Sequence, residues 1–302
     1  MQLNTLKITT ILKESRQYPS LLKEIPNPPS KIFVLGKFPA DPPVGGLKIA
    51  IVGTRKATLE GRLIAKKIAQ RLAELKIVVV SGLAMGIDTA AHEGALAGNG
   101  ETIAVLACGL NTIYPRQNEN LAKKIIESGG AIVSEYPTGT PILPHQFLER
   151  NRIVSGLSVA TIVIEAPIDS GALVTARLAA EQGREVFIFP GPINHPNYRG
   201  SHKLIRDGAR LVASIEDILE DLGLENPKSK IRNTKQIINS EIQNIKDENQ
   251  LLVFKTIQEA GKSLNIDKII ELTKLEPQIA NQAIAILIIN SFIKETEHGY
   301  SF

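Results

Sequence analysis

The chain has 302 residues, of which 43% are hydrophobic and 22% charged, and its net charge is only +4. This composition is ordinary for a globular protein, the length favours two domains, and the charge permits a polyanionic partner without requiring one. The single cysteine, Cys108, excludes an internal disulfide framework and, within an apolar run, predicts a buried thiol in a reducing compartment. No signal-peptide layout or membrane-spanning apolar run is present, so we expect a cytoplasmic protein without membrane contact.

The first 46 residues are rich in proline and glycine, which argues against regular helix. The run KIFVLG at 31–36 predicts a short strand. We expect residues 1–46 to form a strap that leads onto the main domain.

From residue 47 onward, apolar and β-branched runs recur, and nearly all are separated by helix-like stretches. The runs are 48–52, 77–80, 102–106, 131–133, 159–164 and 185–189. The clearest helix is predicted over 59–75, with one apolar face formed by Leu59, Leu63, Ile68, Leu72 and Leu75. Continuous apolar strands alternating with amphipathic helices predict an α/β fold over 47–223, a doubly wound and mostly parallel sheet covered on both faces. The helix 214–223 closes this domain.

The C-terminal part has a different pattern. Residues 224–247 are polar and predict a linker. Residues 248–302 predict three helices followed by a hairpin, the layout of a small winged-helix domain. Its expected core is Leu251, Val253, Phe254, Ile257, Ile269, Ile270, Leu272, Ile279, Ile284, Leu287, Ile288, Phe292 and Ile293.

Gly53, Thr54 and Arg55 follow the strand at 48–52, at the carboxyl edge of the sheet, where doubly wound folds bind ligands. A glycine, a hydroxyl and a guanidinium suit a phosphate. The alternative is a tight turn with a solvated arginine. The glycine pattern of a dinucleotide site and the lysine of a P-loop are both missing.

A second turn of small residues contains Ser81, Gly82 and Gly86 just before a helix. Asp88 and His92 are four residues apart, so they share one face of that helix. They could line the pocket, but we favour a buried pair that fixes the helix to the loop.

The triplet Arg150, Asn151 and Arg152 stands at a predicted helix start, where two guanidiniums and an amide suit phosphates or base edges. The alternative is an arginine clamp on backbone carbonyls. Phe147 suits either base stacking or a core.

Ser170 and Gly171 open a third helix whose N-terminus suits a phosphate, and Lys203 lies on a basic helix edge that could equally be a solvated face. Catalytic motifs are not found, and the histidines lack metal-ligand neighbours. We therefore expect no metal and no cofactor.

Seven segments in this order resemble the DNA-processing protein A (DprA/Smf) family over about residues 19–222: GTRKAT, SGLAMGIDTAAHEGAL, TIAVLACGLNTIYPRQNENL, SEYPTG, RNRIVSGLS, EAPIDSGALVTARLAAEQGREVFIFPG and GSHKLIRDGA. The resemblance implies a Rossmann-like, dimeric, non-enzymatic protein with a C-terminal winged helix. It would bind and protect incoming single-stranded DNA and load the recombinase RecA in natural transformation or homologous recombination. By motif, its DNA-binding residues would be Gly53, Thr54, Arg55, Ser81, Gly82, Gly86, Arg150, Asn151, Arg152, Ser170, Gly171 and Lys203.

The chain departs from the family pattern in places. Asn111 replaces a usual aspartate, and Glu149 stands beside the basic triplet, where it could weaken phosphate contacts. We also expect the chain to lack the N-terminal helical domain of some members. The scarcity of aromatic residues favours charge and backbone contacts over stacking.

Two other function classes fit less well. The related LOG-type nucleotide phosphoribohydrolases carry a catalytic glutamate after a glycine-rich turn, and EAPIDSGALVTA has no acid at that spacing. A transcription regulator would need basic residues on the third helix of the winged-helix domain, and ANQAIAILIINS has none.

Overall fold

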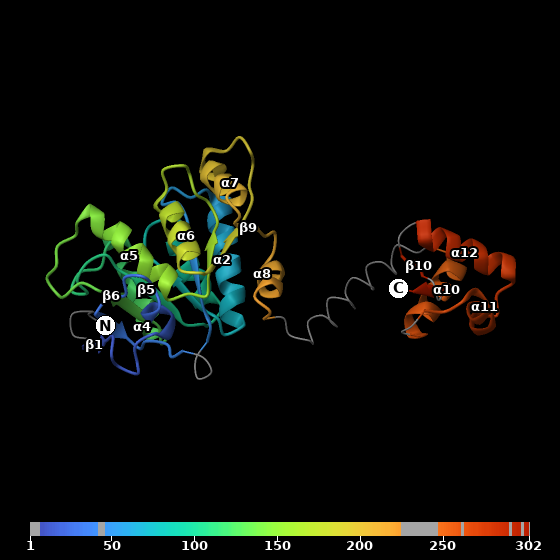
Figure 1. Ribbon diagram of the computed structural model, residues 1–302, viewed down its shortest axis with the longest axis horizontal. Coiled ribbons are helices and arrows are strands. Elements are labelled where there is room, and N and C mark those ends of the chain that lie inside the picture. The colour runs from blue at the N-terminus through green and yellow to red at the C-terminus, as the bar shows by residue number, and fades with distance from the viewer. Residues whose placement is uncertain are drawn as a thin grey trace. The chain divides into compact units, whose positions relative to one another are not determined.

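The computed structural model describes residues 7–41, 46–224, 247–260, 263–289, 292–296 and 299–301 (Figure 1). The chain divides into two compact units, Met1–Leu222 and Gly223–Phe302. The predicted linker lies, apart from its two end residues, outside the described residues.

The large unit is built on one nine-stranded sheet with the order β1-β2-β6-β5-β4-β3-β7-β8-β9. All neighbours from β6 to β9 are parallel, while β2 pairs antiparallel with β6 and β1 with β2. The strands are β1 (Ile8–Leu12), β2 (Lys31–Gly36), β3 (Lys48–Val52), β4 (Val78–Ser81), β5 (Thr102–Val105), β6 (Ala131–Ser134), β7 (Ala160–Val163), β8 (Glu185–Ile188) and β9 (Arg210–Leu211). The predicted Rossmann-like, mostly parallel α/β fold is confirmed.

The predicted strap is part of this sheet. Its strand over 31–36 is present as β2, and β1 is a second strand that we did not predict. β1 forms the sheet edge, and only one of its residues, Ile11, is buried. Both strands extend the parallel sheet beyond β6.

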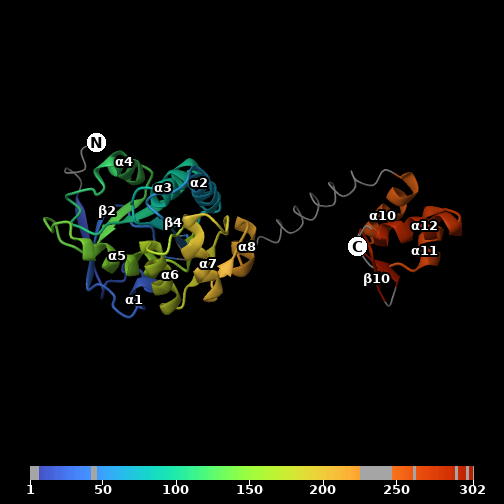
Figure 2. The same cartoon turned by 90° about the horizontal axis from the view of Figure 1, so that it is seen from above.

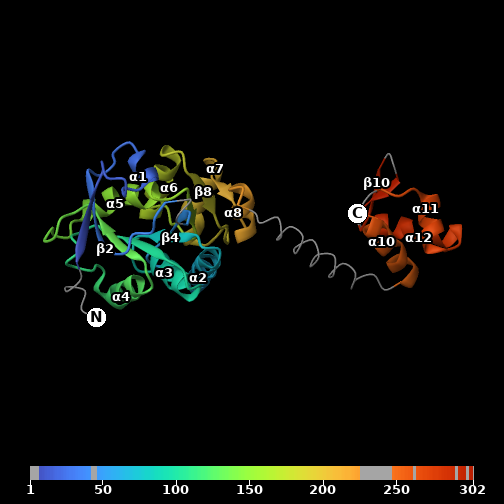
Figure 3. The same cartoon turned by 90° about the horizontal axis from the view of Figure 1, so that it is seen from below.

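Helices cover both faces of the sheet, as the continuous apolar strands require. Figures 2 and 3 show α2, α3 and α4 on one face and α1, α5, α6 and α7 on the other. The helices are α1 (Ser20–Lys23), α2 (Leu59–Glu74), α3 (Ile87–Ala97), α4 (Glu119–Glu127), α5 (Pro144–Gly156), α6 (Gly171–Glu181), α7 (Arg199–Arg206) and α8 (Ile215–Asp221), with short 3₁₀ turns at Arg116–Asn118 and Pro196–Tyr198.

The buried face of α2 agrees only in part with the predicted stripe, of which Ile68 and Leu72 are buried. Leu59 is 66% exposed and Leu63 is 58% exposed, and Leu75 beyond the helix end is also exposed. The face that packs consists mainly of small residues: Gly61, Ala65, Ile68, Ala69, Leu72 and Ala73. It meets an equally small face of α3, where a Cβ at Gly94 would overlap the carbonyl oxygen of Lys66. Close helix contact therefore decides which face of α2 is buried.

The order of the strands places a crevice in the sheet. From β3 the chain proceeds through β4, β5 and β6 on one side, and it then returns to the other side of β3 with β7 and β8. In doubly wound sheets, ligands bind outside the carboxyl ends of the strands at such a reversal. The expected site therefore lies between the ends of β3 and β7.

The small unit contains α10 (Glu248–Ala260), α11 (Ile266–Thr273), α12 (Pro277–Ile289) and the antiparallel pair β10 (Lys294–Thr296) and β11 (Gly299–Ser301). Its core agrees with much of the expected set, but Leu272 is 51% exposed and Ile279 is 38% exposed. Leu264, which we did not predict, is buried and bridges Tyr300. Three helices followed by a strand pair match the predicted order, and the winged-helix assignment stays a prediction. Within the described ranges, no helix is both long and apolar enough to cross a membrane.

Candidate nucleic-acid interface

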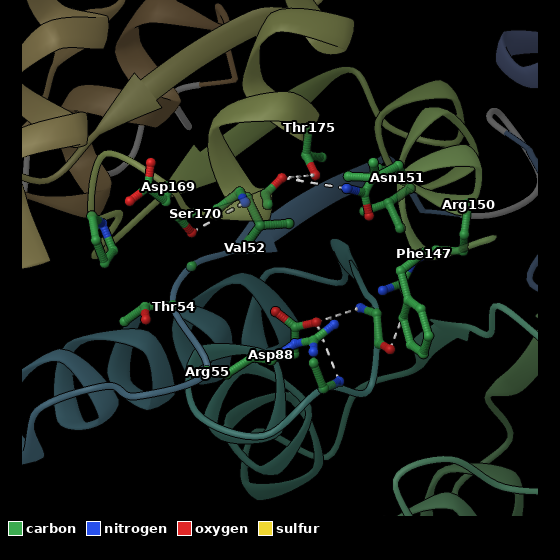
Figure 4. Close-up of a pocket in the computed structure, with 18 of the residues that line it drawn as sticks. Val52, Thr54, Arg55, Asp88, Phe147, Arg150, Asn151, Asp169, Ser170 and Thr175 are labelled. Atoms are coloured by element: carbon green, nitrogen blue, oxygen red, sulfur yellow. Dashed lines mark hydrogen bonds between the residues drawn. The ribbon is translucent and has the colours of Figure 1, made fainter. Parts of the chain in front are cut away.

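A pocket of about 730 Å³ lies at the predicted crevice (Figure 4). Its walls come from the loops after β3 and β7, from α5 and from the N-terminal turn of α6. Figure 4 shows Arg55 and Asp88 on one side of it and Ser170, Thr175 and Asn151 facing them. Eight of the predicted binding residues line it: Gly53, Thr54, Arg55, Gly82, Arg150, Asn151, Ser170 and Gly171.

The β3–α2 loop presents the most accessible of these side chains. Its start is fixed, because the N–H of Thr54 donates to the carbonyl of Glu165 at 2.7 Å. The side chain of Thr54 is buried, and its hydroxyl accepts from the N–H of Lys56 at 3.2 Å. Arg55, in contrast, is exposed, and its guanidinium lies 5.2 Å from the ring centroid of Phe147. The loop therefore offers an exposed cation on a rigid base.

The opposite wall is the N-terminus of α6. Ser170 caps this helix and accepts a hydrogen bond from the N–H of Ala172 at 3.2 Å. The carbonyl of Gly171 accepts from Asn151 and Thr175, both at 3.3 Å, which fixes the first turn. A Cβ on Gly171 would meet nothing closer than 4.0 Å, so the backbone is open to the pocket. The positive end of a helix dipole with an accessible backbone suits an anion.

Arg150 forms the floor of the pocket rather than a protruding contact. It is 5% exposed, and its Nη1 donates to the carbonyl of Gly82 at 2.7 Å and to that of Val105. This is the clamp on backbone carbonyls that we kept as the alternative for the triplet. A Cβ at Gly82 would collide with the guanidinium, so glycine is needed there. Arg150 still lines the pocket and contributes its positive charge.

Asp88 and His92 are both buried, but each has its own partner. Asp88 accepts from the N–H groups of Gly82 and Ala84 at 3.1 and 3.3 Å, so it fixes the β4–α3 turn. Burial raises the pKa of the Asp88 carboxyl, while the charge of Arg150 opposes that shift. His92 contacts the hydroxyl of Thr102 at 2.8 Å. His92 therefore belongs to the scaffold, as we favoured, whereas Asp88 fixes the turn and also lines the pocket, which was the alternative.

Aromatic rings stand at the rim of the pocket. Phe147 of α5 is half-buried and meets Tyr114 edge to face, with 5.6 Å between the ring centroids. Tyr114 is 41% exposed and, like Lys56, was not among the predicted site residues. Tyr114 follows the predicted strand 102–106, and this position after a strand was the sequence signal that could have identified it as a site residue. Rings of this kind can stack on bases.

Four predicted residues lie elsewhere. Ser81 is buried, and its hydroxyl donates to the carbonyl of Ile51 at 2.7 Å. Gly86 has φ +85°, and a Cβ there would overlap the carbonyl of Thr54, so it allows two loops to touch. Arg152 pairs with Glu135 at 2.5 Å, away from the pocket lining, because successive residues of a helix point in different directions. Lys203 is exposed on α7.

The two departures from the family motif have local partners. Glu149 accepts a hydrogen bond from the hydroxyl of Tyr136 at 2.6 Å and does not line the pocket. Asn111 accepts from the N–H of Gly139 at 2.8 Å, a bond that an aspartate could also accept. The described part of the chain contains no cluster of histidine, cysteine and acidic side chains that could hold a metal ion.

The sequence matches the family model described as DNA recombination-mediator protein A over residues 9–223. It is 46% identical to the protein Smf of Escherichia coli K12 over 209 residues, which cover 69% of this chain and 55% of that protein. It is 42% identical to the DNA processing protein DprA of Bacillus subtilis over 219 residues, which cover 72% of this chain and 73% of that protein.

Solved structures agree with these matches. The DNA processing protein A of Streptococcus pneumoniae has a TM-score of 0.64 at 40% identity, over 71% of this chain and 74% of that one. The Helicobacter pylori protein, described for its single-stranded DNA binding mode, has a TM-score of 0.64 at 30% identity, over 73% of this chain and 98% of that one. The chain spans about half the length of two curated relatives, 55% of the E. coli protein and 52% of the Synechocystis Smf. The family model covers well over half of the residues, and the chain therefore belongs to the DNA recombination-mediator protein A family.

Proposed function

We propose that this chain binds single-stranded DNA in the switch-point pocket and acts without catalysing a reaction. The observation that carries the proposal is the exposed Arg55, which faces the open N-terminus of α6 across the pocket. A strand phosphate between them would receive a bidentate contact from the guanidinium and backbone N–H groups from the helix. Phe147 and Tyr114 at the rim would stack on neighbouring bases.

The eight predicted residues that line the pocket are the proposed binding set. Six of them, Gly53, Thr54, Arg55, Asn151, Ser170 and Gly171, shape or present the phosphate site, and Gly82 with Arg150 forms its charged floor. Contacts by Ser81, Gly86, Arg152 and Lys203 stay predictions from the motif.

Binding without hydrolysis is supported by the state of the acidic groups: two carboxylates are engaged in hydrogen bonds, and Asp169, exposed on the pocket wall, is a single acid where glycosidases use a pair. The carboxylate of Asp88 is occupied by the N–H groups of Gly82 and Ala84. The carboxylate of Glu165 accepts four hydrogen bonds and does not line the pocket. A glycosidase-type reaction needs carboxyl groups directed at the scissile bond.

The proposal extends to partners through family membership. The Helicobacter pylori relative is described as binding single-stranded DNA, and a protein of this kind would protect incoming strands during transformation or recombination. We further propose that the chain acts in the cytoplasm as a homodimer and loads the recombinase RecA onto the strand it holds. Light scattering would test the dimer. Filament formation by RecA on strands already covered by a single-strand binding protein would test loading.

The decisive experiment is an anisotropy titration of labelled oligothymidylate with wild-type protein and with Arg55→Ala. We expect a several-fold loss of affinity, equal for unrelated sequences, because a phosphate contact carries no base information. The slope of log K against log salt should become shallower by about 0.7, the value of one contact to a single strand. Arg71→Ala is the matched control, since Arg71 is exposed at the far end of α2 and pairs with Glu74.

Other outcomes would contradict the proposal. Equal affinity of Arg55→Ala and wild type would remove Arg55 from the site. Displacement of the strand by a mononucleotide at the same concentration, together with release of its base, would favour the phosphoribohydrolase alternative. Preference for duplex over single strands of equal length would favour a duplex-binding regulator.

A further inference from the structure

Glu165, the second residue after β7, has a fully buried carboxylate with an unusually complete set of donors. Oε1 accepts from the hydroxyl of Thr58 at 2.5 Å and from the hydroxyl of Tyr198 at 3.2 Å. Oε2 accepts from the N–H of Thr58 at 3.0 Å and from Nδ2 of Asn197 at 2.9 Å. Four donors satisfy a buried charge that would otherwise be costly.

These bonds fix the β3–α2 loop at both of its ends. The carbonyl of Glu165 holds the N–H of Thr54 at the start, and its carboxylate holds Thr58, the N-cap of α2, at the end. Between them, Asn197 also donates to the carbonyl of Lys56 at 3.1 Å. The loop that carries Arg55 is therefore tied to the segment before α7 through Glu165.

The surroundings of the carboxylate leave it little freedom. A Cβ at Gly61 would lie 2.5 Å from it, so α2 approaches closely. Burial raises the pKa of Glu165, but the hydrogen bonds from Thr58, Asn197 and Tyr198 outweigh burial and lower it below its usual value. The group stays ionised at neutral pH, next to the positive end of the α2 dipole. It does not line the pocket, so its influence on a bound strand must pass through the loop.

We propose that Glu165 is a positioning residue for strand binding, which holds the loop of Arg55 in its binding conformation before the strand arrives. The inference rests on the proposed function, because its readout is single-strand affinity. A loop that is already ordered does not have to be ordered on binding, so its side chains lose less conformational freedom when the strand binds. Loss of the anchor should therefore weaken binding on the order of 3- to 10-fold.

Glu165→Gln is the first test, because the amide keeps the shape but removes the charge. With its oxygen toward the N–H of Thr58 and Asn197, its NH2 group faces the hydroxyls of Thr58 and Tyr198, whose protons lose their acceptor. Asp41→Asn is the matched control. Asp41 pairs with the buried Lys48 at 2.8 Å, at the opposite end of β3, so the same acid-to-amide change occurs away from the pocket. We expect weaker oligothymidylate binding for Glu165→Gln and unchanged affinity for Asp41→Asn.

A double-mutant cycle tests whether the effect passes through Arg55. The double variant Arg55→Ala/Glu165→Gln should bind no more weakly than Arg55→Ala alone. Once the Arg55 side chain is absent, its position no longer depends on Glu165. Thr58→Val removes one hydroxyl donor to the carboxylate and should weaken binding, whereas Thr58→Ser keeps that donor and should restore it. If Glu165→Gln fails to fold, the two Thr58 variants test whether Glu165 positions the loop of Arg55.

Each outcome separates the two proposals. If Arg55→Ala weakens binding while folded Glu165→Gln binds like wild type, Glu165 has no positioning role and the proposed function stands. Additive losses in the cycle, or equal affinities of the two Thr58 variants, overturn the positioning role as well. If wild-type protein does not bind single strands, the proposed function itself fails.

Discussion

Acidification is expected to destabilise the large unit through His92, whose imidazole is completely buried. The hydroxyl of Thr102 donates to the carbonyl of Val79 at 2.6 Å, so the contact between this hydroxyl and His92, at 2.8 Å, requires the proton on Nδ1. Nε2 of His92 has no hydrogen-bond partner within the described part of the chain. A second proton on this ring would create a buried, unpaired cation.

Burial, assisted by the charge of Arg150, lowers the pKa of His92 from 6.5 to about 3. Below pH 6.5 the unfolded chain therefore binds a proton that the folded chain does not bind. The contribution of His92 to stability is complete above pH 6.5 and is lost as the pH falls toward 3. The loss is about 1.4 kcal/mol per pH unit and on the order of 5 kcal/mol over the whole interval.

The measurement compares urea unfolding of wild type and His92→Gln between pH 6 and 4.5. Tyrosine fluorescence follows the large unit, because it holds four of the five tyrosines: Tyr18, Tyr114, Tyr136 and Tyr198. Other titrating groups, including Asp88, are common to both proteins and cancel in the difference. We expect the wild-type unfolding free energy to fall more steeply, by about 2 kcal/mol over this interval. Parallel pH profiles would refute the assignment of a buried neutral imidazole.

Two glycine substitutions separate packing from binding. Gly94→Val should lower the urea midpoint by the equivalent of about 2–3 kcal/mol, because its side chain would collide with the α2 backbone at Lys66. An unchanged midpoint would contradict the close packing of α2 and α3. Gly171→Ala should leave the midpoint unchanged, since its Cβ has open space, but it should reduce oligothymidylate affinity several-fold by obstructing the backbone of α6. Wild-type affinity would show that a strand does not approach this turn.

Most strands of the large unit were predictable because the inner parallel strands are buried on both faces, whereas the exposed edge strand β9 was not predicted. Burial of alternate and intervening residues alike produces the continuous apolar runs that mark β3 and β7. The edge strand β1 gave no such signal, because three of its five residues are exposed and it pairs on one side only. Its place in the sheet depends on β2, which is about 20 residues away in sequence.

The helix α2 shows a limit of periodicity. Leucines recur in its sequence at helical spacing, yet Leu59 and Leu63 lie at the surface. The buried face combines Ile68 and Leu72 with glycine and alanine, and these small residues allow α2 and α3 to approach closely over the sheet. Hydrophobicity alone does not indicate that two helices will prefer contact through small residues.

The sequence by itself determined where the candidate site lies. Gly53 and Ser170 sit in turns that follow strands, and parallel strands bring all such turns to one edge of the sheet. Only the tertiary structure decided which side chains in those turns reach the pocket. Within one helical turn Arg150 points to the pocket floor while Arg152 pairs with Glu135, because helix geometry and neighbouring elements select a direction for each side chain. The role of Glu165 likewise emerged only from two segments, distant from it in sequence, that fold against its carboxylate.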